Sequence, residues 1–145
     1  MNIKISDPTL RDGNHAVNHS ISLSNIKEYC KIAEKIGIDI IEVGHGNGIG
    51  ASSIQVGISR HDDKTMLKTA RKYLKKTKLG IHSIPGFSSI EKNLAPAINL
   101  GVDIVRVASH CTESNTQFKQ IEYCKKKNVK INSKLMMCHI ISDKH

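Results

Sequence analysis

The feature that most constrains the fold is an alternation of short apolar runs and amphipathic stretches along the 145-residue chain. Apolar runs predict strands, and stretches with apolar residues at helical spacing predict helices between them. The strands are expected at 3–10, 38–43, 78–84, 102–108 and 129–140, and the helices at about 25–35, 63–75, 89–100 and 115–126. Because the unit of strand plus helix recurs about every 30 residues, the sequence predicts an α/β fold with about five parallel strands and four helices.

Local signals predict where the helices begin and end. Ser22 or Ser24 can cap the first helix, and Gly37 can end it. Pro96 lies inside the third predicted helix, where its ring should kink the helix or divide it in two. Ser142–Asp143 is typical of the cap of a fifth helix.

Composition and charge favour a cytoplasmic protein without a membrane span. No run of about 18 apolar residues is present, and charged residues follow the N-terminus too early for a signal peptide. The four cysteines show no CxxC spacing, so they are expected to be reduced thiols and not a zinc site. The net charge of +9 comes from lysines that gather on predicted helix faces, without a nucleic-acid recognition module, so no nucleic-acid partner is expected. The positive field would favour anionic substrates.

A group of polar side chains follows the first predicted strand. Arg11, Asp12 and His15 lie within five positions, and Gly13 between them permits a tight turn. Arg11 can bind a carboxylate or an enolate, Asp12 is an oxygen ligand for a divalent cation, and His15 can carry a proton near neutral pH. From chemistry alone, a surface ion pair at the end of a strand explains these residues equally well.

Four stretches carry a resemblance to one enzyme family. They are TLRDGNH (9–15), IEVGHGNGIGASS (41–53), VRVASHCTE (105–113) and KLMMCHI (134–140). In this order they resemble the 4-hydroxy-2-oxovalerate (4-hydroxy-2-oxopentanoate) aldolases, HMG-CoA lyase-like metal-dependent enzymes built on a TIM barrel. Histidine at position 15, where the acyl-CoA-using members usually have glutamine, is the mark of the aldolases.

The resemblance implies a TIM (β/α)8 barrel, which needs roughly 250 residues when complete. Residues 1–145 are therefore expected to form a single domain, the N-terminal part of such a barrel, with an open edge after the fifth strand. The implied reaction is the retro-aldol cleavage of 4-hydroxy-2-oxopentanoate, a small 2-oxo acid, to pyruvate and acetaldehyde. Asp12 would be a ligand of a divalent ion, Mn²⁺ or Mg²⁺, that acts as a Lewis acid. Arg11 would stabilise the enolate, and His15 would take the proton from the 4-hydroxyl group.

The glycine-rich loop after the second strand is long enough to be functional. By resemblance, the loop residues that would close over the substrate or shape the aldehyde end of the pocket are His45, Gly46, Ser52 and Ser53. His110 and His139 also fall at the ends of predicted strands. Several histidines at the carboxyl ends of barrel strands favour a site at that end.

Three of the polar residues within the predicted strands, Glu42, His82 and Arg106, bear on the site. Glu42 needs a partner, because burying a lone charge is costly. The resemblance implies that Arg11 is this partner and that Glu42 holds its guanidinium in place, while Arg106 in the fourth strand is the alternative. His82 lies in the third strand, where the related enzymes tend to be aliphatic, and is expected to be structural or surface-facing.

The sequence departs from the family pattern where further metal ligands are expected. It has no H-x-H pair and no D-S-[AG]-G stretch, and the tyrosine of the family's C-terminal region is missing. Asp12 is the only recognised metal ligand. The chain is therefore interpreted as a truncated aldolase that needs a complementary C-terminal aldolase fragment.

Two alternatives stay open. The chain could be a catalytically inactive remnant or interaction module that joins full-length aldolase chains or an acylating acetaldehyde dehydrogenase. It could also be an acyl-CoA Claisen-type lyase or synthase, which His15 argues against.

Overall fold

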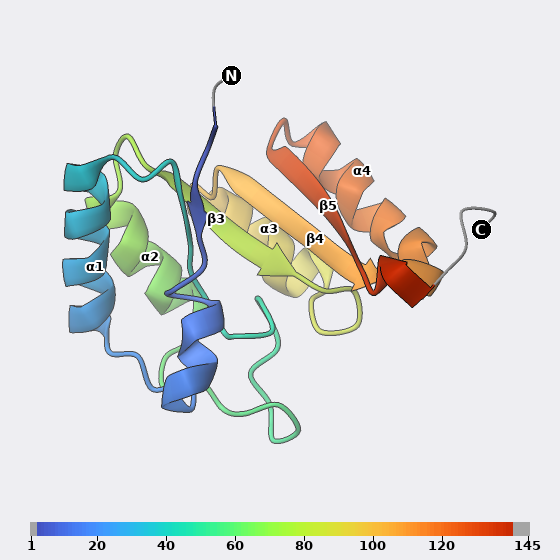
Figure 1. Ribbon diagram of the computed structural model, residues 1–145, viewed down its shortest axis with the longest axis horizontal. Coiled ribbons are helices and arrows are strands. Elements are labelled where there is room, and N and C mark those ends of the chain that lie inside the picture. The colour runs from blue at the N-terminus through green and yellow to red at the C-terminus, as the bar shows by residue number, and fades with distance from the viewer. Residues whose placement is uncertain (1–2, 141–145) are drawn as a thin grey trace.

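The computed structural model describes residues 3–140 and contains a five-stranded parallel sheet (Figure 1). The strands are β1 (Ser6–Asp7), β2 (Ile40–Glu42), β3 (Lys78–Ser83), β4 (Ile104–His110) and β5 (Lys130–Met136). Their order in the sheet follows the sequence, and each neighbouring pair is parallel. The predicted α/β architecture is confirmed as an open half-barrel, in which β1 and β5 are the edges of the sheet among the described residues.

The helices lie along one face of this curved sheet (Figure 1). They are α1 (Leu23–Ile36), α2 (Asp63–Tyr73), α3 (Ala95–Asn99) and α4 (Phe118–Lys126). Short helical turns connect strands to these helices, namely η1 (Asp12–Val17), η2 (Ile90–Leu94) and η3 (Cys111–Gln117), and a further turn, η4 (Cys138–Ile140), follows β5. Within residues 3–140, no helix has the length and apolar character to cross a bilayer.

The helix ends follow the expected local signals. The Ser22 hydroxyl accepts a hydrogen bond from Asn25 N at 3.1 Å, so Ser22 is the cap of α1. Gly37 ends that helix at φ 78°, a left-handed conformation that glycine adopts without steric cost. The third predicted helix is divided as expected, because the π-helical η2 ends at Leu94 and the regular turns of α3 begin beside Pro96.

The first and the last strand are several residues shorter than their apolar runs predict. The run 3–10 pairs only over Ser6–Asp7, because Pro8 has no N–H and the backbone turns there. Arg11 N and Asp12 N both donate to Pro8 O, at 2.9 and 2.7 Å. The run 129–140 ends as a strand at Met136, and a helical turn, η4, follows. The expected cap at 142–143 lies outside the described residues.

The hydrophobic core lies between the sheet and its helices. Leu79 and Ile81 of β3 belong to this core, together with side chains such as Leu67 of α2. Because successive side chains of a strand point to opposite faces, Gly80 and His82 point to the other face, the inner side of the half-barrel. Burial raises the pKa of the Cys30 and Cys124 thiols to about 12 and about 11. The four cysteines are free thiols.

Glu34 of α1 ties that helix to the segment that leads into β3. Its carboxylate accepts hydrogen bonds from Lys75 N at 3.0 Å, Lys76 N at 2.7 Å and Thr77 N at 3.0 Å. Burial alone would raise the pKa of this carboxyl, but the three N–H groups lower it to about 2. Glu34 therefore fixes α1 against the start of the third βα unit.

Replacing Glu34 by alanine should lower the free energy of unfolding by about 2 kcal/mol, because three backbone donors lose a charged acceptor. Glu28→Ala, on the same helix, is the matched control, since the Glu28 carboxylate is exposed and within residues 3–140 pairs with Lys27 and Lys31 alone. Urea unfolding followed by circular dichroism measures both changes. Equal effects of the two substitutions would contradict the role given to Glu34.

Candidate active site

Glu42 lies between two arginines on the inner face of the half-barrel. Arg11 Nε donates to Glu42 Oε2 at 3.1 Å, and Arg11 Nη2 lies 3.1 Å from the same oxygen. Arg106 Nη2 pairs with the other oxygen, Oε1. Glu42 is 2% exposed, so its charge is neutralised by these partners and not by water. The structure thus brings together both candidate partners of Glu42 that the sequence offered.

The Arg11 guanidinium is held on almost every side. Its Nη1 donates to Asp12 Oδ1 at 2.8 Å and to the carbonyl oxygen of Gly46 at 3.0 Å. A guanidinium has five N–H groups. After the contacts with Glu42, one N–H of Nη2 has no acceptor among the described residues. Arg11 is thus oriented rigidly and keeps a donor for a bound anion.

Asp12 is the exposed carboxylate of this group. It opens η1, and its side chain is 64% exposed. One oxygen accepts from Arg11, which leaves Oδ2 without a hydrogen-bond partner in the described part of the chain. No group of three or more His, Cys, Asp or Glu side chains within 3–140 is arranged to hold a metal ion. Asp12 can supply one oxygen ligand, but the described residues do not complete a coordination sphere.

Three histidines gather beside Arg11. The ring centroids of His15 and His19 are 4.9 Å apart, and those of His19 and His45 are 3.7 Å apart with the rings stacked. Burial lowers the pKa of His19, and the nearby His45 and His15 lower it further. Burial also lowers the pKa of His45. The stacked pair is therefore neutral at physiological pH, whereas His15 is exposed to solvent.

His45 is fixed by two backbone contacts. Asn47 N donates to its Nδ1 at 3.0 Å, so the proton of the neutral ring is on Nε2. That nitrogen lies 3.0 Å from the Gly57 carbonyl oxygen and donates to it. Both ring nitrogens are therefore occupied, and His45 shapes the loop instead of meeting a ligand. The sequence did not single out His19, although its position one helical turn after His15 was a usable signal.

Gly46 joins the arginine to the histidines. Its carbonyl accepts from Arg11, and its N–H donates to His19 Nδ1 at 3.5 Å. A Cβ atom at this position would lie 2.2 Å from Nε2 of His15. Only glycine lets the His15 ring pack this closely against the loop.

Ser52 and Ser53, expected in the same loop, lie in its outer turn. Ser52 Oγ accepts from Ser59 N at 2.9 Å, and Ser53 N donates to the Gly57 carbonyl at 3.0 Å. No hydrogen bond connects either serine to Arg11 or His15. The structure therefore brings His45 and Gly46 to the arginine and leaves the two serines in the turn that supports them.

His82 is not surface-facing, which corrects one of the two sequence-based expectations. It is 6% exposed, because the loop passes over it and Ile49 N donates to its carbonyl oxygen at 2.9 Å. Burial, followed by the positive charges of Arg11, Arg106 and Lys134, lowers its pKa to about 4. A neutral imidazole therefore lies beside the arginines on the inner face.

The histidines after β4 and β5 have other surroundings. His110 caps η3, with its Nδ1 2.7 Å from Thr112 Oγ1. His139 is exposed on η4. Neither has a hydrogen bond to the Arg11 group in the described part of the chain, so β4 contributes Arg106 to the site and not His110.

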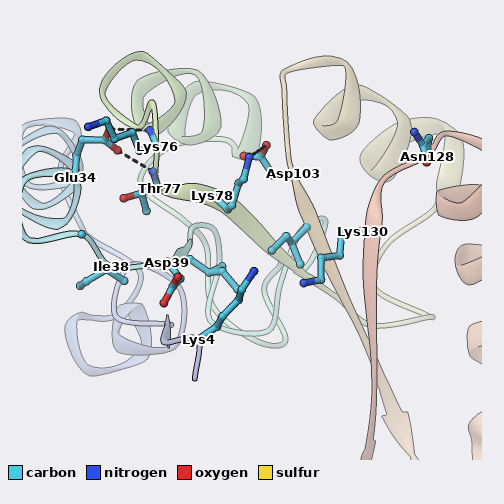
Figure 2. Close-up of a pocket in the computed structure, with 13 residues that line it drawn as sticks. Lys4, Glu34, Ile38, Asp39, Lys76, Thr77, Lys78, Asp103, Asn128 and Lys130 are labelled. Atoms are coloured by element: carbon cyan, nitrogen blue, oxygen red, sulfur yellow. Dashed lines mark hydrogen bonds and ion pairs between the residues drawn. The ribbon is translucent and has the colours of Figure 1, made fainter. Parts of the chain in front are cut away.

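A cavity of about 510 Å³ lies at the opposite end of the strands, between Lys4, Asp39 and Lys130 among others (Figure 2). Its carboxylates already have partners. Asp39 Oδ2 accepts from Ile5 N at 2.9 Å, and Asp103 pairs with Arg71 at 2.7 Å. Active sites of parallel barrels lie at the carboxyl ends of the strands, where η1 and the 44–59 loop meet (Figure 1). The candidate active site is therefore the Arg11 group and not this cavity.

Glu42→Gln should lower the free energy of unfolding by roughly 3 kcal/mol, because two guanidinium groups lose their buried counter-charge. Glu122→Gln is the control, since Glu122 pairs with Lys126 at 2.8 Å on the exposed face of α4 and should change little. Urea unfolding measures both variants. A loss at Glu42 no larger than that at Glu122 would show that the two arginines do not depend on it.

The stability of the chain should fall as the pH is lowered from 7 to 5. The pKa of His82 is about 4 in the folded chain and 6.5 as its ordinary value, so the unfolded chain takes up a proton that the folded chain refuses. This difference is worth about 2 kcal/mol of unfolding free energy over that range. His19 and His45 also lower the stability as the pH falls. The contribution of His82 is therefore measured as the difference between the unchanged chain and His82→Leu in the slope of unfolding free energy against pH, from urea unfolding at several pH values. An unchanged slope in that variant would contradict the neutral, buried state of His82.

Comparisons with known proteins agree with this architecture. The family model described as HMGL-like matches residues 2–138. The chain is 52% identical over 138 residues to a 4-hydroxy-2-oxovalerate aldolase of Spirochaeta aurantia, covering 95% of this chain and 40% of that protein. It is 49% identical over 140 residues to 4-hydroxy-2-oxovalerate aldolase 2 of Salinispora arenicola, covering 97% of this chain and 40% of that protein. The chain thus spans about 40% of the length of these relatives.

Among solved structures, the carboxyl transferase domain of Rhizobium etli pyruvate carboxylase superposes with a TM-score of 0.70 at 13% sequence identity. The match covers 91% of this chain and 24% of that chain, and at this identity it supports the fold alone. The family model, in contrast, spans nearly the whole sequence. The chain belongs to the HMGL-like family.

Proposed function

We propose that this chain carries part of the active site of an aldolase that cleaves 4-hydroxy-2-oxopentanoate to pyruvate and acetaldehyde. The observation that carries the proposal is the meeting of Arg11, Asp12 and His15 at the carboxyl ends of the strands. The supporting comparison is the identity of about half the residues with proteins named 4-hydroxy-2-oxovalerate aldolase. The chain spans about 40% of the length of those proteins, so the activity of a whole aldolase is itself part of the proposal.

In the proposed reaction, His15 accepts the proton of the 4-hydroxyl group. The C3–C4 bond then breaks, acetaldehyde leaves, and the electron pair forms the enolate of pyruvate. The enolate takes a proton from water at C3, and His15 returns its proton to water, so the ring is neutral again. His15 suits this role because its ring is exposed on η1 and held in place by Gly46.

Arg11 stabilises the negative charge that develops on the enolate oxygen. Its position is set before substrate binds, because Glu42, Asp12 and the Gly46 carbonyl already orient the guanidinium. Glu42 acts through Arg11 and does not touch the substrate. Arg106 shares Glu42, and the charges of the two arginines favour binding of the substrate carboxylate at this end of the sheet.

A divalent metal ion, Mn²⁺ or Mg²⁺, is part of the proposal. Asp12 would supply one oxygen ligand, which its exposed Oδ2 permits, and the remaining ligands would come from substrate, water and residues beyond those described. When bound, the ion would act as a Lewis acid toward the 2-oxo group.

The open edge of β5 favours a second role that is compatible with the first. β5 pairs with β4 over seven residues, and its other edge has no partner strand among the described residues. An unpaired edge of this length is suited to pairing with another segment. A complementary C-terminal aldolase segment is the partner we propose, and an acylating acetaldehyde dehydrogenase is a further candidate. Neither the inactive interaction module nor the acyl-CoA enzyme is favoured by a specific contact.

Pyruvate release from 4-hydroxy-2-oxopentanoate with Mn²⁺ tests the proposal, on the chain alone and with the C-terminal part of a relative added. Turnover should disappear with a chelator and fall by about 10² to 10⁴ in His15→Gln, because the general base is lost. Gly46→Ala should also reduce turnover, since its Cβ would displace the His15 ring. Gly13→Ala is the matched control, because among the described residues a Cβ there meets the Thr9 methyl alone, at 3.6 Å.

The outcome that contradicts this function is specific. Full activity in His15→Gln would remove His15 from the reaction. Absence of turnover in both preparations, with Mn²⁺ and folded protein, would contradict the aldolase proposal and favour a binding role.

A further inference from the structure

His82 has no protein partner for a buried ring nitrogen. Its Nδ1 is enclosed and makes no hydrogen bond, and within residues 3–140 the only other such side-chain atom is Ser59 Oγ. The residue lies on β3 in register with Arg106 of β4, and the backbone of Gly48 packs against it. An apolar side chain would fill this position without leaving a polar atom unsatisfied.

The surroundings of His82 place it in the candidate active site. The charges that act on its ring are those of Arg11, Arg106, Lys134 and Asp12. Under the proposed function, Arg11 and Asp12 face the carboxylate and 2-oxo groups of the substrate. His82 lies on the next strand after Glu42, further around the same inner face. It is therefore suited to meet the part of the substrate that lies beyond the bond to be cleaved.

The chemistry of the ring indicates which group it would meet. The pKa of about 4, caused first by burial and then by the nearby arginines, keeps His82 neutral, with one donor and one acceptor nitrogen. A hydroxyl group can donate or accept, so it satisfies Nδ1 in either tautomer. A methyl group forms no hydrogen bond with Nδ1 in either tautomer, and a carboxylate can accept a hydrogen bond but cannot donate one.

We propose that His82 makes this site select 2-oxo acid substrates that carry a hydroxyl group on the aldehyde-derived part, in preference to alkyl ones. The inference rests on the proposed function. Nδ1 is enclosed without ligand, so the bond forms after the imidazole turns about its Cβ–Cγ bond toward the inner face. This torsion is soft and broad, and a half-turn exchanges Nδ1 with Cδ2. The site thus accepts 2-oxo acids whose cleavage releases pyruvate and a hydroxyaldehyde such as glycolaldehyde.

The test uses two unreactive mimics of the aldehyde, glycolamide and propionamide, which differ by a hydroxyl in place of a methyl group. Each is titrated into the 145-residue chain, or into a His82 variant, with pyruvate and Mg²⁺ present, and the backbone amide signals of β3 and of the 44–59 loop are followed by NMR. Glycolamide should bind about tenfold more tightly, because only it satisfies the buried nitrogen. His82→Leu should abolish this preference. His82→Asn should keep part of it, since the amide carries a polar atom near the position of Nδ1.

Equal affinities for the two amides, a preference that survives in His82→Leu, or binding of neither amide would each overturn the inference. An equal loss of both amides in His82→Leu would also overturn it, because His82 would then contact a group that the two share. Turnover of 4-hydroxy-2-oxopentanoate is measured separately. If the substrate is cleaved but the two amides bind equally, only the role given to His82 is wrong. If glycolamide is preferred but no preparation cleaves the substrate, the aldolase reaction is wrong and the site is a hydroxyl-selective binding site.

Discussion

The candidate site depends on one carboxylate shared by two guanidinium groups. From β2, Glu42 contacts Arg11 in the turn after β1 and, across β3, Arg106 of β4. With 2% of its surface exposed, Glu42 has almost no water to screen its charge, so the ion pairs are strong and directional. The same contacts that hold the sheet together therefore orient the Arg11 donor toward the open inner face.

The histidines depend on the backbone of one loop. The Gly46 carbonyl accepts a hydrogen bond from Arg11, and the Gly46 N–H donates to His19. The His15 ring occupies the space that a side chain at position 46 would fill. The stacked pair of His19 and His45 remains neutral, because burial lowers the pKa of both rings, and His15 beside them lowers both pKa values further. A neutral pair supports the loop without competing with Asp12 for a cation or with Arg11 for an anion.

The two ends of the sheet differ in how they use their charges. At the amino ends of the strands, Glu34, Asp39 and Asp103 are occupied by backbone N–H groups and by Arg71 (Figure 2). At the carboxyl ends, Asp12 and one N–H of Arg11 remain available. This division is typical of parallel barrels, in which one end contributes stability and the other carries the chemistry.

The sequence by itself determined the order of strands and helices, because apolar periodicity is a local property that each βα unit carries in its own residues. It also indicated Arg11, Asp12 and His15 as candidate site residues, and it predicted that Glu42 pairs with an arginine. The tertiary structure decided what depends on register and on the path of the loop. It placed both arginines on Glu42, stacked His19 on His45, left Ser52 in the outer turn and covered His82. These partners are distant in sequence, so no local pattern specifies them before the sheet forms.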